Sequence, residues 1–391
     1  MFNRLIEQEI IKYIDNDKIL LLLGARQVGK TSIIKNLKSY LEKEGIVSNY
    51  INLENPDFLN LLNEHPENLF KIVGKSESKK IIFIDEVQYL KNPSNFLKYI
   101  YDEYKGNIKL IVSGSSAFYI DKNFKDSLAG RKKIFYINTL NFEEFLIFKG
   151  QEHLIKYLKE KNVLLIDKND LYYYYYEYIT YGGYPDVVLE DDFEEKRNLL
   201  EEIGLSYIKK DILEAGVEYE DKYYFILKIL SSQVGSLLNL NEISNTINLN
   251  VVTVEKYIYI MKKSFHIATI TPFYQNIRKE LTKMQKVYFY DLGLRNYFLN
   301  NFDSFDYRID KGALFENIVF RNFLNKYKVT DLKFWRTQNK NEVDFIIEKD
   351  KKAYEVKVNK AKFDIKKYKL FLENYPDFKL ELIDFDSSIF L

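Results

Sequence analysis

The chain has 391 residues, no cysteine, and an almost even balance of 58 Lys and Arg against 57 Asp and Glu. Its length predicts two to three domains, and the lack of cysteine excludes disulfides, thiolate metal sites and a cysteine nucleophile. The charge balance gives no whole-chain argument for nucleic acid, and no apolar run approaches the roughly 20 residues of a membrane span, so we expect a cytoplasmic protein without a membrane partner.

The first informative segment is an apolar run, 19–23, followed by a glycine-rich stretch and a helical pattern over 30–44. A strand, loop and helix in this order aim backbone N–H groups and the helix dipole at one point, where phosphates bind. The glycines would permit the turn, Lys30 would reach the β and γ phosphates, and Thr31 would bind Mg²⁺. The segment therefore predicts a nucleoside triphosphate site, with ATP as the expected ligand. The predicted binding residues are Gly24, Ala25, Arg26, Gln27, Val28, Gly29, Lys30, Thr31 and Ser32.

A second apolar strand, predicted over 80–86, ends in Asp85 and Glu86. Buried parallel strands are unbroken apolar runs, and ligands gather at their carboxyl ends. Asp85 would hold Mg²⁺ and Glu86 would polarise the attacking water, although an acidic helix start is the alternative. A third strand, 109–112, ends in serines, of which Ser113 is either a γ-phosphate sensor or an ordinary turn or cap residue.

Further strands are predicted over 48–53 and 133–137. Arg131 precedes the latter strand and would stabilise transition-state charge in its own site or in a neighbouring subunit's, unless it is a solvated surface arginine. Asn141 and Glu144 predict a capping box for a helix that begins at residue 142.

The middle third contains a tyrosine-rich helical stretch at 172–178 and an amphipathic helix over 196–213. Segment 240–291 resembles a winged helix-turn-helix, with helices near 242–245 and over 251–263 and two strands around 267–272 and 286–290. Its local basic excess suggests contact with DNA phosphates and an entry into the major groove, unless the module couples domains instead. The basic residues are Lys256, Lys262, Lys263, Arg278, Lys279, Lys283 and Lys286, against Glu255 and Glu280.

In the last third, a helix predicted over 313–326 places Glu316 on an otherwise apolar stripe. A carboxylate that faces the core is costly unless it has a partner, so Glu316 is a candidate functional residue. Strands over 342–347 and 353–358 flank a polar turn and predict a hairpin. In the second strand, the alternation of side chains puts Glu355 and Lys357 on one face.

Taken together, these segments resemble AAA-type ATPases of archaea and bacteria that couple a P-loop module to a restriction-nuclease-like C-terminal domain. The motifs are Gly24 to Thr31, Ile51 to Glu54, Phe83 to Gln88, Leu128 to Arg131, Gly182 to Pro185, Val287 to Leu294, and Glu342 to Phe345. The expected architecture is α/β: a P-loop NTPase domain with a doubly wound parallel sheet (1–160), a helical and winged-helix region (161–305) and a small α/β nuclease-like domain (306–391).

The resemblance also implies a PD-(D/E)xK site in the last domain. Glu316, Asp344 and Glu355 would bind Mg²⁺ or Mn²⁺, and Lys357 would position or deprotonate the attacking water. The alternatives are a surface hairpin with an incidental E-x-K pair, or a nuclease-like fold that serves as an inactive platform.

Two functions follow from these expectations. In the first, ATP hydrolysis gates a metal-dependent nuclease that acts on nucleic acid. In the second, the chain is an ATP-driven regulatory switch whose C-terminal domain recognises a partner without cleaving it. A trans-acting Arg131 would require a homo-oligomer.

Overall fold

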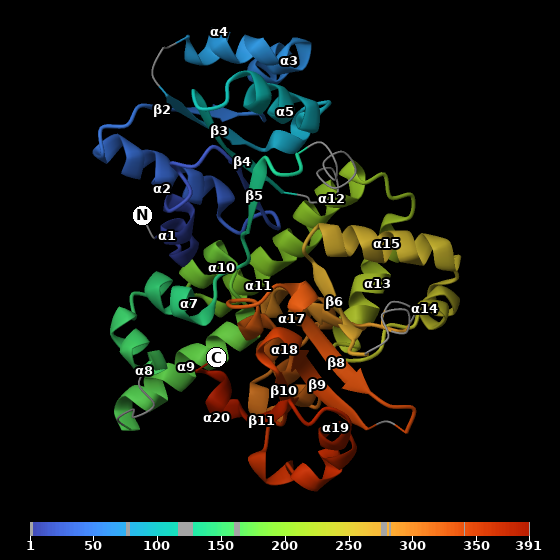
Figure 1. Ribbon diagram of the computed structural model, residues 1–391. Coiled ribbons are helices and arrows are strands. Elements are labelled where there is room, and N and C mark those ends of the chain that lie inside the picture. The colour runs from blue at the N-terminus through green and yellow to red at the C-terminus, as the bar shows by residue number, and fades with distance from the viewer. Residues whose placement is uncertain are drawn as a thin grey trace. The chain divides into compact units, whose positions relative to one another are not determined.

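The computed structural model describes residues 3–75, 79–115, 128–159, 165–274, 280, 283–339 and 341–390. The chain divides into two compact units (Figure 1). The first unit comprises Met1–Asn138 and Lys263–Phe265, and the second comprises Thr139–Lys262 and His266–Leu391. The three-part division expected from the sequence stays a prediction.

The first unit contains a five-stranded sheet in the order β2-β3-β4-β1-β5, and all its neighbouring strands are parallel. Its strands are β1 (Ile19–Leu23), β2 (Ser48–Asn52), β3 (Lys80–Asp85), β4 (Ile108–Gly114) and β5 (Lys132–Tyr136). All five residues of β1 are buried, as a central parallel strand requires. The sheet confirms the predicted parallel α/β fold. Because β4 lies between β1 and β3, the carboxyl ends of these three strands meet at one edge.

The helices of the first unit precede or connect these parallel strands. They are α1 (Leu5–Ile11), α2 (Lys30–Lys43), α3 (Pro56–Glu64), α4 (Leu69–Val73) and α5 (Pro93–Glu103), with 3-10 turns η1 (Pro66–Asn68) and η2 (Val87–Tyr89). Helix α2 begins directly after Gly29, whose φ of 91° favours glycine. At Gly24 a Cβ atom would lie 2.0 Å from the Ile137 carbonyl oxygen. Both glycines are therefore needed to shape the loop between β1 and α2.

The second unit begins with a helical region. Its helices are α7 (Phe142–Phe148), α8 (Ile155–Lys159), α9 (Leu165–Tyr181), α10 (Pro185–Leu189), α11 (Phe193–Glu202), α12 (Ile208–Glu214), α13 (Glu220–Ser232), α14 (Leu240–Ile247) and α15 (Val251–Lys263), with η3 (Glu152–Leu154) and the π-helical η4 (Ile203–Tyr207). The predicted capping box at the start of α7 is present: Glu144 N–H donates to Asn141 at 2.8 Å, and Asn141 N–H donates to Glu144 at 3.1 Å.

The two strands predicted as a wing, β6 (Ile267–Pro272) and β7 (Lys286–Phe289), form an antiparallel pair. They do not stand apart from the C-terminal strands. Thr271 and Pro272 of β6 pair in parallel with Lys333 and Phe334, which joins β6 and β7 to the C-terminal sheet. Two helices and two strands thus occur in the ranges expected, the strands belong to the larger sheet, and the winged helix-turn-helix stays a prediction.

This second sheet has six strands in the order β11-β10-β9-β8-β6-β7 (Figure 1). Its other strands are β8 (Leu332–Arg336), β9 (Glu342–Ile347), β10 (Lys352–Val356) and β11 (Lys379–Ile383). The accompanying helices are α17 (Leu292–Leu299), α18 (Lys311–Phe323), α19 (Lys369–Asn374) and α20 (Phe385–Ser388), with η5 (Phe305–Tyr307), η6 (Val329–Asp331), η7 (Glu348–Asp350), η8 (Lys360–Lys362) and η9 (Ile365–Tyr368). The hairpin of β9 and β10 is antiparallel, as predicted.

Helix α18 packs on this sheet through aromatic side chains. The Phe320 ring stacks on Tyr288 of β7 at 4.7 Å between centroids, and Phe323 contacts Phe345 of β9 at 5.3 Å. A separate apolar cluster joins Trp335 and Val343 of the sheet to Phe371 of α19. Among the described residues, no helix combines the length and apolar character that crossing a bilayer requires.

Candidate functional site

The first candidate site lies at the carboxyl end of β1. Lys30, the first residue of α2, is buried, and its Nζ donates to the carbonyl oxygens of Gly24 at 3.0 Å and Ala25 at 2.6 Å. Val28 is buried, whereas Gln27 and Ser32 are exposed at the loop and the helix start. The ammonium group of Lys30 is thus held over the loop that the sequence predicts to cradle phosphates.

The neighbouring Asp85 ends β3 and is the hub of a hydroxyl network. Thr31 Oγ1 donates to Asp85 Oδ2 at 2.7 Å, Tyr50 donates to the same oxygen at 2.9 Å, and Ser113 donates to Oδ1. Burial and the Asp85 carboxylate both raise the pKa of Tyr50, so this phenol stays protonated and keeps donating. The structure therefore brings together Thr31, Asp85 and Ser113, and it adds Tyr50, which the sequence did not single out.

Glu86 follows in a left-handed conformation, with φ of 58°, which is uncommon for a residue other than glycine. Its N–H donates to Ser113 Oγ at 3.0 Å. Gln88 Nε2 donates to the Glu86 carboxylate and to Ser115 Oγ at 2.8 Å. Ser113 and Gln88 thus fix the backbone and the side chain of Glu86. Ser116, at the end of the same serine run, lies outside the described residues.

Arg131 is not part of this site. Its carbonyl accepts the N–H of Ile19, the first residue of β1, and its guanidinium makes two hydrogen bonds to Asp102 at 2.7 and 3.1 Å. The phosphate-binding loop follows the last residue of β1, and five strand residues span about 16 Å. The expectation that Arg131 acts in its own site therefore needs correction. A role in a neighbouring subunit's site stays a prediction.

The oxygen donors at the end of β3 fit Mg²⁺. This ion takes hard oxygen ligands, and it is commonly held by one or two protein side chains together with phosphates and waters. The Thr31 hydroxyl and the Asp85 carboxylate are adjacent and provide such donors. In the presence of nucleotide, these two residues would hold the ion, which would offset charge on the phosphates.

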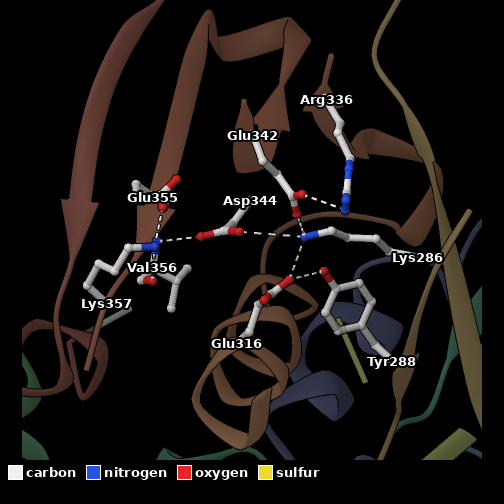
Figure 2. A network of polar contacts seen from close by, with 9 residues as sticks. All are labelled: Lys286, Tyr288, Glu316, Arg336, Glu342, Asp344, Glu355, Val356 and Lys357. Carbon is white, nitrogen blue, oxygen red and sulfur yellow. Dashed lines mark hydrogen bonds and ion pairs between the residues drawn. The ribbon is translucent and has the colours of Figure 1, made fainter. Parts of the chain in front are cut away.

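The second candidate site is a carboxylate cluster in the second unit, formed by Glu316, Glu342, Asp344 and Glu355. Figure 2 shows the Lys286 side chain from β7 reaching between three of them. Its Nζ lies 2.9 Å from Glu316 Oε1 and 3.5 Å from Asp344 Oδ1, and it also forms an ion pair with Glu342. The side chain of Lys286 is 1% exposed. Burial alone would lower its pKa, but the three carboxylates outweigh burial and raise it, so Lys286 is charged.

Asp344 marks the point where β9 and β10 separate. Their pairing ends at Phe345 and Tyr354, and beyond it Asp344 Oδ2 accepts the Val356 N–H at 2.9 Å. Lys357 follows β10 and forms an ion pair with Glu355. The predicted residues Glu316, Asp344, Glu355 and Lys357 therefore do converge.

The environment of the cluster raises the pKa of two of its carboxyl groups to near neutral pH. Burial raises the pKa of Glu316 to about 7, even though Lys286 lowers it and Tyr288 donates a hydrogen bond at 2.6 Å. Burial and the Asp344 charge likewise raise the pKa of Glu355 to about 7, against the lowering effect of Lys357. The Glu355 side chain is 6% exposed, and a hydrogen bond with Tyr368 also lowers its pKa.

A divalent metal does not fit this cluster as it is arranged. The oxygen donors are of the right kind, but Lys286 lies between three of them and Lys357 pairs with the fourth. Across the described ranges, no group of three or more His, Cys, Asp or Glu is placed to hold a metal ion. The expectation that Glu316, Asp344 and Glu355 hold Mg²⁺ or Mn²⁺ is therefore not met in this arrangement. Sequence reasoning missed Glu342 and the role of Lys286.

Lys286 also changes the predicted basic patch. It is internal and paired with carboxylates, so it cannot contribute to a DNA-facing surface. Arg278 and Lys279 lie outside the described residues. Lys256 and Lys283 are exposed, and Glu280 is paired with Lys333 at 2.9 Å. The positive charge of this patch at the surface is thus smaller than the number of basic residues in the sequence suggests, and DNA binding stays a prediction.

Comparisons with known proteins agree with the first site. A family described as AAA domain matches residues 16–146. Two domains of unknown function match the remainder, DUF8612 over residues 173–304 and DUF4143 over residues 311–384. The uncharacterized protein MJ1544 of Methanocaldococcus jannaschii is 27% identical over 394 residues, covering 98% of this chain and 84% of the relative. An uncharacterized protein of Haemophilus influenzae is 27% identical over 380 residues, covering 92% of this chain and 86% of the relative.

Among solved structures, similarity is distant. The Aeropyrum pernix ORC1 protein in complex with DNA has a TM-score of 0.34 at 12% identity, over 77% of this chain and 93% of that chain. AMPPCP-bound DnaA from Aquifex aeolicus has a TM-score of 0.30 at 16% identity, over 65% and 86% of the two chains. The sequence match of residues 16–146 and the parallel sheet with its glycine-rich loop together support an AAA-type P-loop fold for this part of the chain.

Proposed function

We propose that the chain binds ATP at the carboxyl end of β1 and hydrolyses it with Mg²⁺. The observation that carries this proposal is the hydrogen bond from Thr31 to Asp85 at 2.7 Å, which joins the phosphate-binding loop to the acidic end of β3. Lys30 binds the β and γ phosphates, and exchanges its carbonyl partners for phosphate oxygens when it does so. Glu86, oriented by Ser113 and Gln88, polarises the attacking water.

The test is phosphate release from ATP and binding of a fluorescent ATP analogue, measured on the native chain, Lys30→Ala and Glu86→Gln. We expect both variants to lose turnover. Nucleotide binding should fall strongly in Lys30→Ala, because the phosphates lose a charged donor, and should survive better in Glu86→Gln, because Glu86 serves the hydrolytic step. Full turnover in either variant would overturn the assignment.

The C-terminal carboxylate cluster supports a second candidate function, in which the nucleotide state controls a nuclease-like domain that acts on nucleic acid. The favouring observation is that Glu316, Asp344, Glu355 and Lys357 converge in the order of a PD-(D/E)xK site. In the arrangement described, however, Lys286 occupies the space between the carboxylates. This favours the alternative of an ATP-driven regulatory switch whose C-terminal part recognises a partner without cleaving it.

A cleavage panel separates these two functions. DNA and RNA, single- and double-stranded, are incubated with Mg²⁺ or Mn²⁺, with and without ATP, and the native chain is compared with Asp344→Ala. Cleavage by the native chain that disappears in Asp344→Ala would establish the nuclease. An absence of cleavage from folded protein that hydrolyses ATP would support the regulatory switch.

A further inference from the structure

Lys286 differs from the buried Lys109 and Lys196 in having three carboxylate partners; Lys196 has one, Glu177, at 3.1 Å. Lys109 donates to the carbonyl oxygens of Tyr13, Asn16 and Lys18 at 2.6 to 2.8 Å, which closes a turn in the backbone. The neighbours of Lys286 are instead carboxylates from two separate elements, Glu316 of α18 and the pair Glu342 and Asp344 of β9. The role of Lys286 is therefore to supply positive charge at a point where acids from distant parts of the sequence meet.

That point requires a cation. A buried charge is costly unless it is paired, and carboxylates that share a site cannot all ionise without a positive partner. Of the three acids, Glu342 also has Arg336 as a partner, at 2.8 Å. Glu316 has Lys286 and the Tyr288 hydroxyl, both on β7 (Figure 2). Strand β7 thus contributes both the charge and the hydrogen bond that keep Glu316 in place.

An ammonium group and a divalent ion would compete for this space. Divalent ions bind carboxylate oxygens at about 2.0–2.6 Å, and Lys286 Nζ already lies 2.9 Å from Glu316 Oε1 and 3.5 Å from Asp344 Oδ1. An ion placed among the same oxygens would overlap the Nζ group and meet its positive charge. Occupancy by Lys286 and occupancy by a metal are therefore mutually exclusive.

We propose that Lys286 is an internal cation that takes the place of a divalent metal ion among Glu316, Glu342 and Asp344 and thereby keeps this cluster free of metal. The lysine is an autoinhibitory contact built into β7. If its charge is removed, the three carboxylates become a site for Mn²⁺ or Mg²⁺. The exclusion of metal by Lys286 does not depend on the proposed ATPase activity.

The test measures direct binding of Mn²⁺ to the nucleotide-free full chain. Electron paramagnetic resonance of the free ion and calorimetry both report the binding. We compare the native chain with Lys286→Met and Lys286→Arg. We expect Lys286→Met to gain a Mn²⁺ site with an affinity at least about tenfold above that of the native chain. Lys286→Arg keeps the positive charge and should not gain the site. The gained site should disappear when Asp344→Asn is added to Lys286→Met, which separates it from any ion bound at the P-loop.

The matched control is Lys333→Met. Lys333 lies on β8 of the same sheet and is paired with two glutamates, Glu280 and Glu348, but not with the cluster. Its removal should leave Mn²⁺ binding unchanged. A gain in Lys333→Met equal to that in Lys286→Met would overturn the proposal, because the effect would then reflect general charge.

Lys286→Met has a risk of misfolding, since it leaves buried carboxylates without their cation. The melting temperature with and without Mn²⁺ addresses this risk: stabilisation by the ion in Lys286→Met, absent from the native chain, supports the proposal. The native chain provides a test that needs no folded variant. Mn²⁺ binding by the native chain that Asp344→Asn abolishes would show that the metal enters while Lys286 is present, and would refute the proposal. If any of these variants loses ATPase activity, that loss concerns the P-loop site alone and does not change how the Mn²⁺ binding result is interpreted.

Discussion

Ser113→Ala is a sharp test of the P-loop site, because one hydroxyl serves two partners there. Ser113 Oγ donates to Asp85 Oδ1 and accepts the Glu86 N–H at 3.0 Å, and the residue is fully buried. The variant loses a hydrogen bond to a charged group, worth about 1.5–3 kcal/mol, and leaves a partly buried N–H without its partner, which costs about 1–3 kcal/mol at most. Since the two losses share one atom and are not additive, we expect a decrease of about 2–4 kcal/mol in the free energy of unfolding of the first unit.

The same change should lower kcat more than it weakens ATP binding. Glu86 has a positive φ, and without its hydrogen bond to Ser113 its backbone can relax, which displaces the carboxylate. A displacement near 1 Å costs about 100-fold in rate, so we expect kcat to fall about 10–100-fold. The assays are urea unfolding and steady-state ATP hydrolysis, with Ser231→Ala as the control, because Ser231 is also fully buried but its hydroxyl donates to the Lys228 carbonyl in the second unit. A kcat within twofold of native, with unchanged stability, would refute the assigned role of Ser113.

Three further predictions concern other residues. Gly24→Ala should abolish binding of a fluorescent ATP analogue and lower stability by about 1–3 kcal/mol, because its Cβ atom would clash with a backbone carbonyl; native-like binding would contradict this. Burial would raise the pKa of Asp310, but Arg308 and Arg295 outweigh it and lower the pKa to about 2, so this carboxylate stabilises the fold above pH 4. In urea unfolding, Asp310→Asn should cost about 2 kcal/mol at pH 7, and the difference from native should shrink as the pH falls from 4 towards 2; a pH-independent difference would count against the ion pairs. Arg131→Ala should leave the ATP affinity of the isolated chain unchanged, and a loss of ATPase activity confined to high protein concentrations would indicate a role in a neighbouring subunit.

Strands β1 and β3 of the first sheet could be predicted closely because each contains a continuous apolar run. Segment 19–23 was predicted as a strand and is β1, and segment 80–86 became β3 at Lys80–Asp85. In a parallel sheet covered on both faces, burial alone dictates such runs, so local sequence is sufficient. Because the carboxyl ends of parallel strands meet at one edge of the sheet, the predicted strands also placed Asp85 and Ser113 together at that edge.

Strand direction also contained a signal about Arg131 that sequence reasoning did not use. In a parallel sheet, residues that precede a strand lie at the opposite end from residues that follow one. Arg131 precedes β5 and the phosphate-binding loop follows β1, and the two strands pair from Ile19 with Lys132 onward. Its distance from the loop could therefore have been inferred before the structure was known.

The role of Lys286 had no such local signal. In the sequence it is one of several basic residues near a helix-turn-helix pattern, and its spacing suggests a surface. Its burial depends on β7 pairing with β6 and on β6 pairing with β8, contacts that join segments 286–289, 267–272 and 332–336. Its partners lie 30 to 58 residues further along the chain. Long-range pairing of this kind is invisible to a local pattern.

The two sites differ in how their carboxylates are held, and this difference bears on which of them accepts a metal. At the P-loop, Asp85 is bonded by the hydroxyls of Thr31, Tyr50 and Ser113. Hydroxyl groups orient a carboxylate without neutralising it, and they can rotate to present a lone pair, so a cation that arrives with phosphates finds both a charge and a ligand. In the C-terminal cluster, the partners of Glu316 and Glu355 include the ammonium groups of Lys286 and Lys357. An ammonium group offers no lone pair and already satisfies the charge, so a metal must displace it before it can bind. The chemistry of the partners thus allows a metal to bind at the end of β3 directly, whereas metal binding at the C-terminal cluster requires a lysine to move away first.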